Sequence, residues 1–129
     1  MLVREQGLEN VFGRHARHGE ATRAAVRAWG LELLCANPAE YSNSLTAVLL
    51  PDGCNEADFR RVALEHFNLS LGAGLGKVAG KVFRIGHLGD FNDLMLCGTL
   101  CGVEMGLAQA RVRHQPGGVA AAMKVLTGA

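Results

Sequence analysis

Residues 72–92 read GAGLGKVAGKVFRIGHLGDFN, a glycine-rich turn that leads into a short strand. Five glycines fall between Gly72 and Gly86, where average usage of about 7% would give roughly one. Because glycine has no Cβ, such a run lets the backbone adopt positive φ and approach a partner closely. This stretch therefore predicts a turn whose backbone lies close to a neighbouring group.

An arginine at the centre of the following strand is the candidate binding residue. Along VFRIG at 82–86, Phe83 and Ile85 are expected to face one side of the sheet and Arg84 the other. A guanidinium held on a strand beside a glycine loop suits two-point capture of a carboxylate or phosphate. An ordinary ion pair on a surface strand explains the same spacing, so the residues leave both interpretations open.

The composition describes one globular domain. The chain has 129 residues, 49% of them hydrophobic and 19% charged, which suits a single modest core. A net charge of +1 argues against a broad surface for nucleic acid or anionic membranes. No secretory signal is visible, and no apolar run approaches the ~18 residues that would span a bilayer. The four cysteines, Cys35, Cys54, Cys97 and Cys101, lack zinc-like spacing, so we expect reduced thiols in a cytoplasmic protein.

Hydrophobic periodicity predicts the order helix, two strands, helix, two strands, helix. Gly30 is placed to end the first helix, Asn55 to cap the second, and Asn92 or Asp90 to cap the last. The apolar stripe of the second helix includes His66, which predicts a satisfied core histidine. The expected fold class is α+β, a two-layer sandwich in which helices cover a small, mostly antiparallel sheet. The expected elements are a helix at 5–28, strands at 31–35 and 44–50, a helix after residue 55, strands at 69–71 and 82–85, a helix at 92–109, and a helical turn or two at 117–126.

No motif forms a complete catalytic or nucleotide site. The glycine run has the wrong spacing for a P-loop, and Lys77 stands where a dinucleotide fingerprint needs its third glycine. His15 and His18, with Glu20 nearby, have permissive spacing for a metal. No second ligand cluster accompanies them, so a partly buried or surface pair is the simpler interpretation. His87 closes the strand of the candidate arginine, where it either reaches a ligand or only turns the chain.

Several stretches together follow the pattern of one family. They are the segment at 72–92, LML at 94–96, GVEM at 102–105, EQGLEN at 5–10, WGL at 29–31 and NEADFR at 55–60. These stretches, which extend over residues 2–110, resemble the C-terminal domain of class V aminotransferases. The serine–glyoxylate and alanine–glyoxylate group is the most similar.

The resemblance implies the small domain of a fold-type I pyridoxal-phosphate enzyme, usually a homodimer, over residues 1–129. Arg84 matches the family's arginine that grips the α-carboxylate of the amino-acid or keto-acid substrate. Gly72, Ala73 and Gly74 would form the pocket wall beside that carboxylate. The parent activity would be transfer of an amino group from serine, or alanine, to glyoxylate.

The large cofactor domain of that family has no counterpart in this sequence. That domain supplies the Schiff-base lysine and the phosphate cup, and Lys77, Lys81 and Lys124 do not lie in the family's lysine context. We therefore expect the isolated chain to bind no pyridoxal phosphate and to be inactive. The alternative is a stand-alone, non-catalytic binding or oligomerisation module derived from this domain. The expected partners are the missing large domain, a small amino-acid or keto-acid substrate and a second copy of the chain, with no nucleic acid and no membrane.

Overall fold

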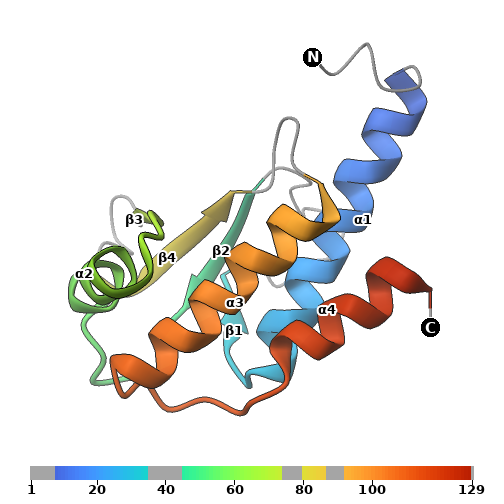
Figure 1. Ribbon diagram of the computed structural model, residues 1–129. Coiled ribbons are helices and arrows are strands. Elements are labelled where there is room, and N and C mark those ends of the chain that lie inside the picture. Colours follow the sequence, from blue (N-terminus) through green and yellow to red (C-terminus); the bar gives the residue numbers. More distant parts are fainter. Residues whose placement is uncertain (1–7, 35–44, 74–79, 87–91, 129) are drawn as a thin grey trace.

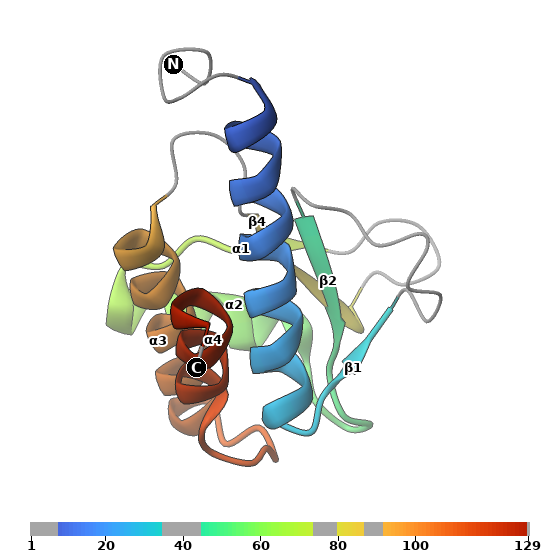
Figure 2. The same cartoon turned by 90° about the vertical axis from the view of Figure 1, so that its right-hand side faces the viewer.

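The computed structural model describes residues 8–34, 45–73, 80–86 and 92–128. The strands lie together on one side and the helices on the other, as Figures 1 and 2 show. The predicted α+β two-layer sandwich is therefore confirmed. In chain order the elements are α1 (Leu8–Ala28), β1 (Glu32–Leu33), β2 (Leu45–Leu49), α2 (Glu56–Phe67), β3 (Gly72–Ala73), β4 (Val82–Gly86), α3 (Asp93–Gln109) and α4 (Gly118–Thr127).

The four strands form one antiparallel sheet in the order β1-β2-β4-β3. On one face of the central pair, Val48 of β2 lies opposite Phe83 of β4, and Thr46 lies opposite Ile85. All four side chains are buried. The alternation predicted for residues 82–86 therefore places the apolar side chains in the core.

The core joins the buried face of the sheet to all four helices. Trp29, immediately after α1, is fully buried, and Phe59 of α2 lies against Phe83 with ring centroids 4.7 Å apart. Stacking of this kind adds to the free energy gained by burying the ring surface. Other fully buried apolar side chains are Ala21, Ala25, Val26, Leu96, Leu100, Val103, Leu107 and Ala122.

The predicted helix ends are confirmed where the structure describes them. Gly30 has φ +76°, a left-handed conformation that favours glycine after a helix. Asn55 accepts a hydrogen bond from the backbone N–H of Asp58, and Asn92 accepts one from Met95 at 2.7 Å. Each asparagine thereby satisfies one of the free N–H groups at its helix start.

Two predictions are wrong. The strand expected at 69–71 begins only at Gly72, because the chain first turns at Asn68, which has φ 55° and donates from its backbone N–H to the last turn of α2. Leu69 extends this cap by donating its N–H to Ala63 O. His66 is exposed rather than buried, because the buried side of α2 passes through residues 56, 59 and 63, and the next residue of that face is the half-buried Phe67.

Glycines in α3 allow its neighbours to lie close. A Cβ on Gly102 would lie 2.9 Å from Leu69 Cδ2, and one on Gly106 would lie 3.3 Å from Phe59 Cε1. Because these two positions lack a side chain, α3 lies close to Leu69 and to Phe59. None of the described helices has the length and apolar character needed to cross a membrane.

Candidate functional site

Arg84 lies at the middle of β4, with a strand on each side. Its partner in the ladder is Ala47 on β2 and Gly72 on β3. Because Phe83 and Ile85 point into the core, the alternation of the strand turns Arg84 to the opposite face. The side chain is partly buried there.

The guanidinium of Arg84 has no hydrogen-bond or ion-pair partner among the described residues. Its Nε is buried and unpaired within that part of the chain. The ion pair that the sequence left open is therefore not formed with any described carboxylate. A guanidinium that no described carboxylate engages can bind an anionic ligand through its other nitrogens.

Of the three other predicted site residues, the structure places one, Gly72, on the same face of the sheet as Arg84. Gly72 lies directly opposite Arg84, and Ala73 lies opposite Phe83. A Cβ on Gly72 would lie 3.2 Å from Arg84 Nε. Gly74 and His87 lie outside the described residues.

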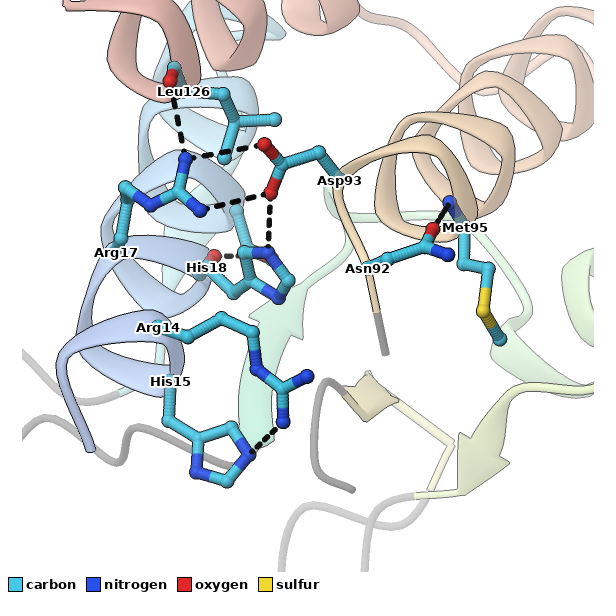
Figure 3. A network of polar contacts seen from close by, with 9 residues as sticks. Arg14, His15, Arg17, His18, Asn92, Asp93, Met95 and Leu126 are labelled. Atoms are coloured by element: carbon cyan, nitrogen blue, oxygen red, sulfur yellow. Dashed lines mark hydrogen bonds and ion pairs between the residues drawn. The ribbon is translucent and has the colours of Figure 1, made fainter. Parts of the chain in front are cut away.

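A second polar cluster, which the sequence did not reveal, joins α1 to the start of α3 (Figure 3). Arg17 donates to both carboxylate oxygens of Asp93, at 3.2 and 3.1 Å, and His18 Nε2 lies 2.8 Å from Asp93 Oδ1. Arg17 also donates to Leu126 O of α4 at 3.1 Å. Partial burial acts to raise the pKa of Asp93, but the hydrogen bonds from His18 and Arg17 outweigh it and hold the pKa below its usual value.

This cluster replaces the metal site considered for His15 and His18. Among the described residues, no group of three or more His, Cys, Asp or Glu side chains could hold a metal ion. His18 is fully buried and bound to Asp93, whereas His15 lies beside Arg14 (Figure 3). The cluster therefore ties α1, α3 and α4 together at the end of the domain where α3 begins.

A third contact, also missed, anchors the start of α4. Trp29 Nε1 donates to Glu104 Oε1 at 2.8 Å, and the backbone N–H of Val119 donates to the same oxygen at 3.2 Å. Burial acts to raise the pKa of Glu104, but these bonds and those from Gly117 and Gly118 lower it overall. The N-cap position of α4 is Gly117, which has no side chain, so Glu104 supplies the cap from α3.

The described residues do not fit a pyridoxal-phosphate site. A Schiff-base lysine is a desolvated group whose pKa is lowered by its pocket. Lys81 and Lys124 are both exposed, and Lys77 lies outside the described residues. Cys54, Cys97 and Cys101 are free thiols, and none of them belongs to a described group of three or more side chains that could hold a metal ion.

Two hollows lie away from Arg84. A cleft of about 380 Å³ beside Trp29 includes Glu32, Asp52 and Arg113 in its wall. A second, apolar hollow of about 430 Å³ lies between the end of α2 and α3, with Phe67, Met95 and Met105 in its wall. Neither is lined by Arg84, Gly72 or Ala73.

Several known proteins similar to this chain are aminotransferases that act with glyoxylate. The chain is 53% identical to the serine–glyoxylate aminotransferase of Methylorubrum extorquens over 123 residues, which is 95% of this chain and 31% of that protein. It is 55% identical to the serine–glyoxylate aminotransferase of Arabidopsis thaliana over 104 residues, 81% of this chain and 26% of that protein. The chain thus spans less than a third of the length of these curated relatives.

The fold of the chain also matches solved structures of aminotransferases. The ureidoglycine–glyoxylate aminotransferase of Bacillus subtilis matches with a TM-score of 0.88 at 30% identity, over 98% of this chain and 33% of that one. No protein-family model matches the chain. Over nearly all of its residues the chain therefore matches the C-terminal small domain of class V aminotransferases of the serine–glyoxylate and alanine–glyoxylate group.

Proposed function

We propose that this chain is the substrate-carboxylate-binding domain of an aminotransferase that moves an amino group from serine, or alanine, to glyoxylate. The observation that carries the proposal is the guanidinium of Arg84, which has no partner among the described residues. Serine, alanine and glyoxylate all carry a carboxylate beside the reacting carbon. An arginine that grips this group orients the substrate whichever carbon chain it has.

The expected strength of the grip follows from its chemistry. A hydrogen bond between charged groups contributes about 1.5–3 kcal/mol, which is roughly a 10- to 150-fold change in affinity. Arginine also presents two parallel donors to a carboxylate, which fixes the direction of the substrate as well as its position. Gly72 lies opposite Arg84 on β3, whereas Ala73 lies opposite Phe83 and therefore on the other face of the sheet.

The chemical steps are assigned to a segment other than residues 1–129. Pyridoxal phosphate, when bound in a complete enzyme, supplies the electron sink for amino transfer, and no described lysine of this chain is placed to hold it. We infer that residues 1–129 are one small domain and that the isolated chain does not catalyse the reaction. A cytoplasmic location and a homodimer of the complete enzyme belong to the same proposal.

Two measurements test the proposal. The isolated chain, mixed with pyridoxal phosphate, is expected to show no imine absorbance band and no serine–glyoxylate turnover, and either signal would contradict the assignment. In a complete enzyme that carries this domain, Arg84→Ala should raise the KM for glyoxylate about 10- to 150-fold, and Arg84→Lys should raise it less. Arg61→Ala is the matched control, because Arg61 is exposed on α2 and pairs only with its neighbours on that helix.

An oligomerisation module is the second candidate, and one observation favours it. Leu94, Met95 and Met105 of α3 are 84%, 50% and 47% exposed, and the last two line the apolar hollow. Exposed apolar side chains gathered on one helix favour association with another surface. Sedimentation equilibrium of the isolated chain tests the module: a monomer at high concentration contradicts it, whereas a tight dimer that Met95→Glu dissociates shows that this face of α3 associates without the rest of an enzyme.

A further inference from the structure

We propose that Gly72 is a positioning residue for Arg84: its bare backbone covers one side of the guanidinium and leaves the two terminal nitrogens to grip the carboxylate. The proposal rests on the function assigned to Arg84 above. The new point is the role of Gly72: this residue acts by positioning Arg84 and not by forming a wall against the substrate.

The first observation is the closeness of β3 to β4 at this pair. A Cβ on Gly72 would lie 3.3 Å from Arg84 Cβ. Residues directly opposite each other on antiparallel strands ordinarily keep their Cβ atoms about 4.5–5.5 Å apart. The missing side chain at residue 72 therefore allows β3 and β4 to lie closer together than two strands that carry side chains at both positions.

The second observation is which part of the guanidinium faces Gly72. The three atoms nearest to the Cβ position are Nε at 3.2 Å, Cβ at 3.3 Å and Nη2 at 3.4 Å, so Cζ is farther away than either nitrogen. A point above the flat face between those nitrogens would lie nearer to Cζ than to both of them. Gly72 therefore lies off the Nε–Nη2 edge and not over the face.

The third observation is the accessibility of the nitrogens. Nε is buried and has no hydrogen-bond partner among the described residues, although the Arg84 side chain as a whole is only partly buried. A carboxylate approaching the Nε–Nη2 edge meets the backbone of β3. The open approach is end-on, to Nη1 and Nη2, which still offers two parallel donors.

The consequence of a side chain at residue 72 follows. A methyl group 3.2 Å from Nε must either push β3 away from β4 or rotate the guanidinium about its flexible stem. Rotation of the guanidinium is the easier response, because it leaves the fold intact. It changes the direction in which the two terminal nitrogens of Arg84 point. Losing one of two charge-assisted hydrogen bonds weakens carboxylate binding by about tenfold.

Gly86→Ala is the matched control for Gly72→Ala. Gly86 is on β4 with Arg84, its φ lies outside the left-handed region, and a Cβ added there has no heavy atom within 4 Å. The change in composition is the same in both variants, and only one of them touches the guanidinium.

The experiment is nitrogen-detected NMR of the Arg84 Nε–Hε group in the 129-residue chain, titrated with acetate. We expect slow exchange of Hε with water, an Hε contact to the Gly72 Hα protons, and saturable shifts on addition of acetate. In Gly72→Ala the Hε exchange should accelerate and acetate should bind about tenfold more weakly, while Gly86→Ala should match the parent chain.

The exchange rate of Hε tests the cover by Gly72, and the acetate affinity tests the grip of Arg84 on a carboxylate. Fast Hε exchange in the parent chain contradicts the inference without any variant, so it stays testable if Gly72→Ala does not fold. Equal acetate affinity in a folded Gly72→Ala also contradicts it. Slow exchange that Gly72→Ala abolishes, with no response to acetate in any variant, supports the positioning by Gly72 and refutes the carboxylate function of Arg84.

Discussion

Gly118→Ala should destabilise the domain although alanine is the better helix former. Gly118 is the first residue of α4 and is buried against the indole of Trp29. A Cβ on Gly118 would overlap the Nε1 and Cε2 atoms of that ring. The ring itself is fully buried, and its Nε1 donates to Glu104, so it has no free direction in which to move.

The magnitude combines three effects. Forcing a methyl group into a packed core costs about 1–3 kcal/mol, and displacing Trp29 removes a hydrogen bond to a charged group that contributes about 1.5–3 kcal/mol. Alanine in place of glycine in a helix returns at most about 1 kcal/mol. The net loss in the free energy of unfolding is therefore about 1.5–6 kcal/mol, a fall in Tm of roughly 5–20 °C for a domain of this size.

Urea unfolding followed by tryptophan fluorescence measures this loss directly, because Trp29 is the single tryptophan of the chain. Gly98→Ala is the control, since a Cβ there has nothing within 4 Å, and it should raise stability by up to about 1 kcal/mol. In a Trp29→Phe background, which has no tryptophan and is followed by circular dichroism instead, Gly118→Ala should cost less, because the indole atoms that the new methyl group strikes are gone. Gly118→Ala within 1 kcal/mol of the parent chain, or an equal cost in both backgrounds, would refute this reasoning.

Three further predictions concern charged and thiol groups. The pKa of Asp93 is below its ordinary 3.8, so its carboxylate stabilises the fold above pH 3.8, and this stabilisation is lost as the pH falls through the lowered pKa. Asp93→Asn should therefore lower the free energy of unfolding by up to about 1 kcal/mol at pH 7 and by less at pH 3, as urea unfolding at the two pH values would show. Glu104→Gln should cost about 0.5–2 kcal/mol at pH 7, because the cap of α4 loses its charge, and calorimetry should show the lower Tm. Burial and the neighbouring Cys101 and Asp93 raise the pKa of Cys97, so iodoacetamide at pH 8 should modify Cys97 more slowly than the exposed Cys101, as peptide mass spectrometry would record.

The features that could be predicted from sequence are local ones. Asn55 and Asn92 cap helices because a short polar side chain reaches an N–H only three residues away. Phe83 and Ile85 enter the core because alternation along a strand is fixed by backbone geometry. Hydrophobic periodicity gave the wrong burial for His66. Steps of three and four residues define an apolar stripe, but they do not show whether a neighbouring element covers a residue at the edge of that stripe.

The contacts that could not be predicted join residues far apart in the chain. Arg17 and Asp93 are separated by 76 positions, and Trp29 and Glu104 by 75. A single sequence gives no measure of which distant residues meet, so Asp93 and Glu104 looked like ordinary helix acids. The candidate site could be predicted in part. The predicted strand and turn placed Arg84 near the glycines, but its direct pairing with Gly72 became known only from the register of β3 and β4.

The helical layer has a consequence for the order in which the domain folds during synthesis. α1 packs more extensively on α4 than on any other element, and Figure 2 shows the two helices side by side. By contrast, β3 and β4, which carry Gly72 and Arg84, follow one another in the chain. Pairings between near neighbours form early, whereas those between distant segments wait for the chain between them. During synthesis the strand pair of Arg84 can therefore form while α1 still lacks its main partner, α4.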